Sequence, residues 1–221
     1  MSEEFNIVKN EAKELLGKPL FISLEGCEGV GKTTSLNYIK NFIESFGHQV
    51  LVTREPGGTP LAEEIRNLLL EKRDEKVNSS AELLLMFASR IQHIEKVIKP
   101  ALNKGIWVIS DRFVDASYAY QGGGRGLGFE RIEVIEKWSM GDFLPDLTLL
   151  LDMSVKKGMA RTRLRGDSDR FEDEEIIFFE TIRNAYLKRA EKSKGRIKVI
   201  DASPSPELVQ QAIKKELESC L

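Results

Sequence analysis

The sequence has few of the features that mark secreted, membrane-bound or polymer-binding proteins. Its 221 residues include only two cysteines, Cys27 and Cys220, which is too few for a disulfide framework and is typical of a reducing compartment. An excess of basic residues is also lacking, because 33 Lys and Arg residues are balanced by 35 Asp and Glu residues. This balance argues against a dedicated nucleic-acid binder, so any attraction for anions must be local.

Long hydrophobic runs and targeting segments are absent from the sequence as well. The longest uncharged stretch, residues 116–124, is far shorter than a membrane span. Residues 1–16 are acidic and contain no apolar core of a secretory signal. We therefore expect a cytoplasmic protein that does not bind a membrane. The length suits one domain with a sizeable core.

Five short apolar runs predict the strands of a sheet. Most of them are continuous rather than alternating, which is typical of parallel strands buried on both faces. They are Pro19–Leu24, Gln49–Thr53, Gly105–Ser110, Leu147–Leu151 and Arg196–Ile200. Segments with helical apolar spacing lie between them: Lys32–Phe46, Thr59–Leu70, Ala81–Leu102 and Ile176–Ala190. This alternation predicts a three-layer α/β domain built of right-handed βαβ units.

A phosphate-binding loop is the strongest functional signal in the chain. Residues 26–33 read GCEGVGKT and match the pattern G-x-x-x-x-G-K-[ST], between a predicted strand and a predicted helix. Glycines let successive N–H groups converge on phosphate oxygens, and the positive end of the helix dipole faces the same anion. The Lys32 amine can reach the β- and γ-phosphates, and the Thr33 hydroxyl can ligate Mg²⁺. We expect a nucleoside triphosphate at Gly26, Cys27, Glu28, Gly29, Val30, Gly31, Lys32, Thr33 and Thr34.

Two arginines follow predicted strands and are candidates for binding a second anion. Arg54 comes after the second apolar run, and Asp111 and Arg112 come after the third. In parallel sheets ligands bind at the carboxyl ends of the strands, so both arginines are expected at one edge. Asp111 suits water-mediated Mg²⁺ binding. A structural ion pair at a strand end is the alternative interpretation of each arginine.

Two further segments carry side chains suited to a nucleotide. Ala116–Gly128 combines tyrosine, glutamine and glycine, which can pack on and hydrogen-bond a planar base, although an ordinary loop is the alternative. Met159–Arg170 holds four arginines within twelve residues. Such a run is usually a solvated helix face, but arginines also neutralise a transferring phosphoryl group, and this helix could form a closing lid.

These motifs together resemble the thymidylate kinase family. GCEGVGKTT, TREPGGT, DRF, YAYQGGGRG and RTRLRGDSDRFE occur in that family's order, from about Leu20 to Leu217. The resemblance implies a P-loop nucleoside monophosphate kinase fold, with a five-stranded parallel sheet flanked by helices on both faces. It implies phosphoryl transfer from ATP to dTMP with Mg²⁺, and a homodimer. The domain would span 19–221 after an extension of residues 1–18, with a lid near 158–171.

The resemblance also assigns roles by position. Glu28 would contact the sugar 3′-hydroxyl of dTMP, Arg54 and Arg112 its phosphate, and Arg90 the thymine. Ser117, Tyr120 and Gln121 would complete the site, with Tyr120 against the deoxyribose. Residues 201–204 (DASP) would border the adenine.

Two positions distinguish this chain within the family pattern. Position 29 is Gly, where some members carry a catalytic arginine, so the resemblance implies that Arg165, or as second choice Arg163, acts from the lid. Position 86 is Met, where the family usually has an aromatic residue against thymine. Met86 could pack on the base as a thioether, Phe87 could take its place, or both could be core residues; Phe87 is preferred here.

Other functions compete with this interpretation. The nearest is a kinase of a different nucleoside monophosphate. A regulatory P-loop GTPase is a different class, but the sequence lacks an Asn-Lys-x-Asp motif for reading guanine. The two acceptor-side arginines favour a metabolic kinase.

Overall fold

The structure, a computed structural model, describes residues 18–162 and 175–220 and contains a parallel sheet of five strands in that part of the chain. The strands are β1 (Phe21–Glu25), β2 (Val50–Arg54), β3 (Trp107–Asp111), β4 (Leu147–Asp152) and β5 (Ile197–Asp201). Their order is β2-β3-β1-β4-β5, with all neighbouring pairs parallel. Each predicted apolar run became a strand, and the predicted α/β class is confirmed.

The centre of the sheet is β1, which lies between β3 and β4. All five of its residues are buried, because both faces of this strand are covered. Side chains of a strand point alternately to the two faces, so Ile22 and Leu24 pack into one hydrophobic cluster while Phe21 packs into the other. A continuous apolar run is the sequence pattern that this double burial requires.

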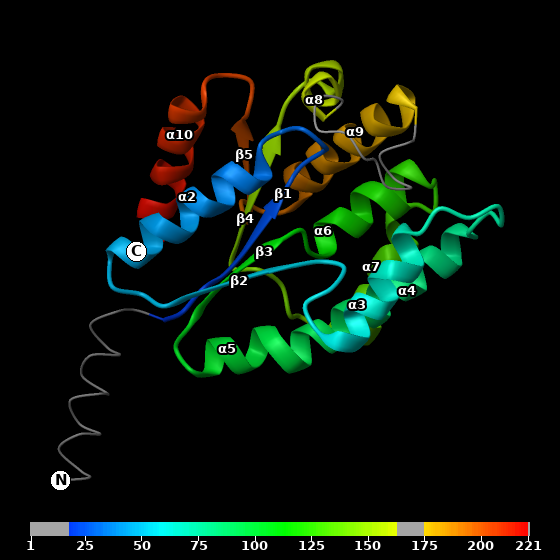
Figure 1. Ribbon diagram of the computed structural model, residues 1–221, viewed down its shortest axis with the longest axis horizontal. Coiled ribbons are helices and arrows are strands. Elements are labelled where there is room, and N and C mark those ends of the chain that lie inside the picture. Colours follow the sequence, from blue (N-terminus) through cyan, green and yellow to red (C-terminus); the bar gives the residue numbers. More distant parts are fainter. Residues whose placement is uncertain (1–17, 163–174, 221) are drawn as a thin grey trace, which may run out of the picture.

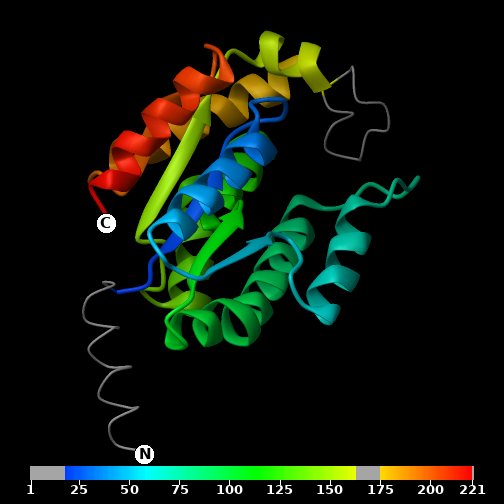
Figure 2. The ribbon, with the colours of Figure 1, turned by 60° about the vertical axis from the view of Figure 1, so that its left-hand side comes forward.

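Helices cover both faces of the sheet, as Figure 1 shows. On one side lie α2 (Lys32–Ser45) and α10 (Pro206–Glu218). On the other side lie α4 (Ser79–His93), α5 (Lys99–Asn103), α6 (Val114–Ser117) and α7 (Phe129–Met140). The remaining helices are α3 (Pro60–Leu70), α8 (Val155–Thr162) and α9 (Ile176–Lys192). In the turned view of Figure 2, α8 lies above the carboxyl ends of the strands, and α9 runs from that end down beside the sheet.

Two predicted segments contain π-helical stretches that the sequence did not predict. The predicted helix Ala81–Leu102 begins at Ser79 and contains a π-helical stretch, Ile94–Ile98, before α5. Pro100 follows that stretch, and proline has no N–H to continue a regular helix ladder. The segment Ala116–Gly128, whose alternative interpretation was a loop, is mostly helical, with a π-helix over Tyr118–Gly124. This second π-helix packs against α9.

The parallel arrangement brings the ends of β1, β2 and β3 to one edge of the sheet. The phosphate loop follows β1, the segment 55–59 follows β2, and Arg112 follows β3. Among the described residues, no helix is long and apolar enough to cross a membrane.

Candidate active site

The loop between β1 and α2 has the backbone of an anion site. Gly26, Gly29 and Gly31 have φ values of 139°, 73° and 94°, which side chains rarely allow. The loop leads directly into α2, whose N–H groups and dipole face the loop. Lys32 folds back over it, and its Nζ donates hydrogen bonds to the carbonyls of Gly26 (3.3 Å) and Cys27 (3.2 Å). The amine is therefore held where phosphates would lie.

Gly29 faces the backbone of α8. A Cβ at this position would stand 2.0 Å from the carbonyl oxygen of Gly158, closer than any real contact. The reverse contact is also tight, since a Cβ on Gly158 would stand 2.5 Å from the carbonyl oxygen of Glu28. An arginine in the loop at position 29 has no room in this arrangement.

Arg112 and Glu28 form an ion pair at the mouth of the loop. The second guanidinium nitrogen, Nη2, donates to Glu28 Oε1, while Nη1 donates to the carbonyl of Gly26 at 2.9 Å. Tyr120 donates its hydroxyl to the same Glu28 oxygen at 3.1 Å. Burial by itself would raise the pKa of Glu28, but the positive charges of Lys32 and Arg112 lower this pKa to about 2. Glu28 is therefore ionised at neutral pH.

Arg54 and Arg66 bring further positive charge to this side of the sheet. Arg54 is exposed, and its Nη2 donates to Glu63 Oε2 at 3.0 Å. Arg66, on α3, donates to the carbonyl of Pro56 at 2.9 Å. Arg66 was not among the residues predicted from the sequence to line the site. The sequence does show that Arg66 lies one helical turn after Glu63, so the two side chains were expected on the same face of the helix.

A buried network holds Arg90. Its Nε donates to Glu55 at 2.6 Å, its Nη1 to the Ser117 hydroxyl at 3.0 Å and its Nη2 to the Phe113 carbonyl at 3.1 Å. On the other side of Glu55 lies His93, whose Nδ1 is 3.0 Å from Glu55 Oε1. His93 and Glu55 were not predicted as site residues: Glu55 lies within the TREPGGT motif and His93 on a predicted helix, but neither pattern shows that the two side chains meet.

Gln121 lies at the buried end of the same region. It is 1 % exposed, and its amide nitrogen donates to Glu82 Oε1 at 2.9 Å. Arg125 also approaches this oxygen, at 3.3 Å. Glu82 is fully buried and fixes both side chains.

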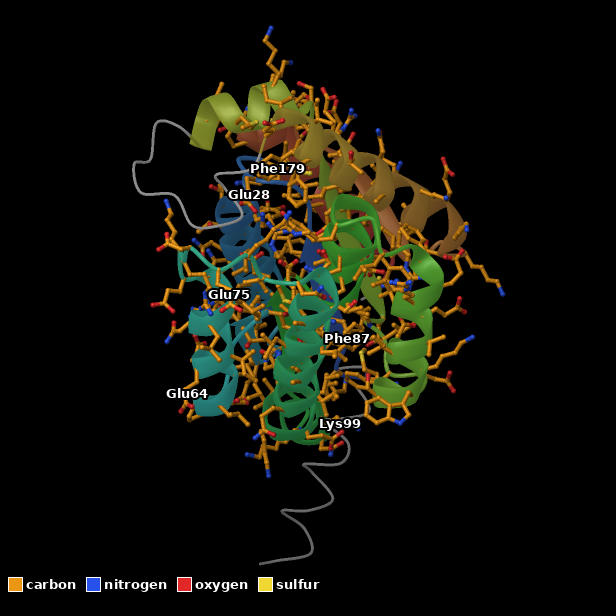
Figure 3. The ribbon with its side chains drawn as sticks, turned by 90° about the vertical axis from the view of Figure 1, so that its right-hand side faces the viewer. Glu28, Glu64, Glu75, Phe87, Lys99 and Phe179 are labelled. Atoms are coloured by element: carbon orange, nitrogen blue, oxygen red, sulfur yellow. The ribbon has the colours of Figure 1, made fainter. Side chains whose placement is uncertain are left out.

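The structure separates Met86 from Phe87. Met86 lines the cavity described below, whereas Phe87 is 2 % exposed and belongs to the hydrophobic core. Figure 3 places the labelled Phe87 on α4, away from Glu28. The guanidinium of Arg90 lies 4.7 Å from the centre of the Phe87 ring, so this ring supports the arginine from behind. The preference for Phe87 at the cavity wall is therefore corrected: adjacent helical residues point about 100° apart, and the helix turns Met86 toward the cavity.

These side chains surround one cavity of about 220 Å³. The predicted residues that line it are Glu28, Lys32, Arg54, Met86, Arg90, Asp111, Arg112, Ser117, Tyr120 and Gln121. Other lining residues are Glu55, Pro56, Arg66, Leu70, Phe113 and Ala116. The motifs therefore meet in space, although they are spread over nearly a hundred positions.

The residues predicted to bind a metal are both at this edge. Asp111 Oδ1 is buried without a hydrogen-bond partner, and Thr33 lies exposed in the first turn of α2. An unpartnered carboxylate oxygen beside a phosphate loop fits a hydrated Mg²⁺. Within residues 18–162 and 175–220, no group of three or more His, Cys, Asp or Glu residues could hold a metal ion by itself. Phosphate oxygens and water would have to supply the other ligands.

Three predictions concern neighbouring segments. Arg163 and Arg165 lie outside the described residues, which stop at the end of α8 and resume before α9. The adenine-bordering segment 201–204 is a turn after β5, closed by a 2.9 Å hydrogen bond from the Ser203 amide to Asp201 Oδ1. This turn lies at the same end of the sheet as the phosphate loop (Figure 1).

Comparisons with known proteins place the chain in a family. Residues 24–213 match the sequence profile of the family described as thymidylate kinase. The thymidylate kinase of Hahella chejuensis is 53% identical over 204 residues, which cover 92% of this chain and 98% of that protein. The thymidylate kinase of Nitrosospira multiformis is 51% identical over 197 residues, 89% of this chain and 96% of that protein. The crystal structure of thymidylate kinase from Ehrlichia chaffeensis has a TM-score of 0.73 at 30% identity, covering 91% of this chain and all of that one.

Proposed function

The chain belongs to the thymidylate kinase family, whose members use ATP to phosphorylate dTMP to dTDP, and we propose which of its residues bind each substrate and assist the transfer. The observation that carries the proposal is the cavity in which the phosphate-loop lysine and the acceptor-side arginines meet. ATP would place its phosphates in the loop, and dTMP would occupy the cavity beside them.

The acceptor is held by charge at one end and by shape at the other. Arg112 and Arg54 would bind the dTMP phosphate, and Glu28, now paired with Arg112, would turn to the sugar hydroxyl. Arg90, fixed by Glu55, would donate hydrogen bonds to the thymine while Met86 packs on the ring. Tyr120 is held against Glu28 and would leave little room for a 2′-hydroxyl.

The transfer itself needs positioning more than acid–base chemistry. The acceptor phosphate is already a nucleophile at neutral pH, so no strong general base is required. Lys32 and Arg112 would neutralise charge as it develops on the transferring group. Thr33, and through water Asp111, would hold Mg²⁺, which would supply positive charge to the phosphates of ATP.

We infer that the remaining catalytic cation comes from the lid. The contact between Gly29 and Gly158 supports this inference, because it leaves no space for an arginine side chain within the loop. Arg165 is the first candidate and Arg163 the second. We expect R165A to lower kcat at least tenfold with little change in ATP and dTMP affinity, measured by steady-state kinetics and equilibrium binding. Unchanged turnover would reject the role of Arg165.

The proposal is tested by a coupled ADP-release assay with dTMP, dUMP, CMP and AMP as acceptors. We expect dTMP to give the highest kcat/KM. The variant K32A should retain the circular dichroism spectrum and melting profile of the wild type and lose phosphoryl transfer. Activity retained in K32A would contradict the assignment of the phosphate loop.

We also propose that the enzyme is a homodimer. The support is the family resemblance together with exposed apolar side chains on α4 and α7.

A further inference from the structure

Behind Arg112 lie two buried residues that do not line the cavity. Tyr186, on α9, is 2 % exposed, and Glu25, the last residue of β1, is fully buried. The Tyr186 hydroxyl donates a 2.8 Å hydrogen bond to Glu25 Oε2 and accepts one of 3.2 Å from Arg112 Nη1. A chain of hydrogen bonds thus runs from the central strand, through the helix that follows the lid segment, to the guanidinium at the phosphate site.

Glu25 is itself fixed on its other oxygen. The Ser23 hydroxyl and the backbone amide of Phe113 donate to Oε1 at 2.8 Å and 2.7 Å. The Phe113 amide belongs to the peptide that directly follows Arg112. One carboxylate therefore holds Arg112 twice, through its backbone and, by way of Tyr186, through its side chain.

The backbone of Arg112 requires such support. Its φ of 68° lies in the left-handed region, which is uncommon for a residue with a side chain and persists only where the surroundings hold it. The Arg112 amide donates to Leu24 at 3.0 Å, and the Ser110 hydroxyl donates to the Arg112 carbonyl at 2.7 Å. These bonds fix the backbone of Arg112. Among the described residues, the hydrogen-bond partners of its Nη1 atom are the Gly26 carbonyl and the Tyr186 hydroxyl.

We propose that Glu25 and Tyr186 are positioning residues that keep the Arg112 guanidinium aimed at the acceptor phosphate. The inference rests on the proposed role of Arg112 in binding that phosphate. When dTMP replaces Glu28 on Nη2, the bonds on Nη1 remain, so the guanidinium does not have to reorient. Because Tyr186 belongs to α9, this connection also ties the phosphate site to the helix that follows the lid segment.

The variant Y186F tests the proposal because it removes one hydroxyl and keeps the ring, which packs edge-on against Tyr120 at 6.4 Å between ring centres. We expect Y186F to raise both the KM and the Kd for dTMP roughly tenfold, the size of one hydrogen bond to a charged group. The KM for ATP should stay within about twofold, since Lys32 and the loop are untouched. Y118F is the matched control: Tyr118 is a buried tyrosine whose ring lies under Arg189 rather than Arg112, and this variant should bind dTMP like the wild type.

A double-mutant cycle with R112A separates the role of Arg112 in binding the phosphate from the role of Tyr186 in positioning Arg112. If Arg112 binds the phosphate, R112A weakens dTMP binding, and adding Y186F to R112A causes no further loss. Additive losses in Y186F and R112A, wild-type dTMP binding by Y186F, or equal losses in Y186F and Y118F would overturn the positioning role. Wild-type dTMP binding by R112A would instead contradict the proposed function of Arg112 itself.

Discussion

The carboxyl groups of Glu25 and Glu28 lie three residues apart, yet their pKa values are shifted in opposite directions. Burial, reinforced by Asp115, raises the pKa of Glu25 to about 7, although Arg112 and the hydrogen bonds of Tyr186 and Ser23 oppose this rise. Glu28 is buried too, but Lys32 and Arg112 outweigh that burial and lower its pKa to about 2. Environment alone separates them, because both are glutamates on the same stretch of chain. Glu28 is thereby a charged group at neutral pH, while Glu25 titrates near it.

The raised pKa of Glu25 makes stability depend on pH. Between pH 4.5 and about 7 the folded protein keeps a proton that the unfolded chain has already lost, so the free energy of unfolding falls as pH rises. A rise of the pKa from 4.5 to about 7 corresponds to about 3 kcal/mol over this window. We expect the stability of the wild type relative to E25Q to fall by an amount of this order between pH 4.5 and 8, measured by urea unfolding. A constant difference between the two proteins across that range would contradict the shift.

The residues that line the cavity were easier to predict from the sequence than the residues that hold them in place. Arg54 and Arg112 follow strands within motifs, so their approach to one cavity was foreseeable from the carboxyl-edge rule. Glu55 and His93 act through contacts between the segment that follows β2 and α4, and no local pattern encodes such a contact. The choice between Met86 and Phe87 depended on the rotation of α4 by one residue, which apolar spacing alone does not fix.

At the scale of elements, the strands were predictable because β1, β3 and β4 are buried on both faces and carry unbroken apolar runs. Their order was not, since the position of β1 between β3 and β4 is set by how the crossover helices pack. The π-helix Tyr118–Gly124 could not be predicted from the sequence either. Its glycines lie against Phe129, Ala185 and Phe178, so the packing of α7 and α9 determines its shape.

The packing of α8 on the phosphate loop gives an element-scale prediction. Glycine inside a helix normally lowers stability, so replacing it with alanine is expected to stabilise the protein by about 0.5–1 kcal/mol. At Gly158 the sign should reverse, because the new Cβ would stand 2.5 Å from the carbonyl of Glu28 and push the helix off the loop. We expect G158A to lower the free energy of unfolding by about 1–3 kcal/mol and to raise the KM for ATP. Urea unfolding and steady-state kinetics measure these changes.

A control for G158A is K156A, an exposed position two residues earlier in the same helix. It changes helix composition without altering the contact with the loop and should behave like the wild type. If G158A were as stable and active as K156A, the prediction that position 158 has no room for a side chain against the loop would be wrong.

For the whole molecule, the charge balance conceals a strongly uneven distribution. The chain has a formal net charge of −2, yet five basic side chains and three carboxylates line one cavity. The basic residues are Lys32, Arg54, Arg66, Arg90 and Arg112, and the carboxylates are Glu28, Glu55 and Asp111. Two of these carboxylates are already paired with arginines. Such a site attracts small anions, whereas the rest of the chain is net acidic and gives no sustained attraction for a polyanion.

The surface also carries apolar side chains that an isolated monomer would leave in water. Trp138 is 82% exposed and Val134 68%, and they lie four residues apart on one face of α7. Leu84 is 57% exposed on α4, the helix that packs against α7. Exposed groups of this kind mark interaction surfaces, and a second copy of the chain is the occupant that the family resemblance implies.

Sedimentation velocity at micromolar concentration should therefore show a wild-type dimer. A variant with both V134E and W138E should sediment as a monomer, because two carboxylates would be buried without partners at a two-fold interface. L208E is the matched control, since Leu208 is 54% exposed on α10, across the sheet from α7, and its replacement should leave the dimer intact (Figure 1). A wild-type monomer, or equal dissociation of both variants, would place the interface elsewhere or exclude it. Because the cavity is lined within one chain, the monomeric variant should keep measurable dTMP binding, which separates assembly from the site.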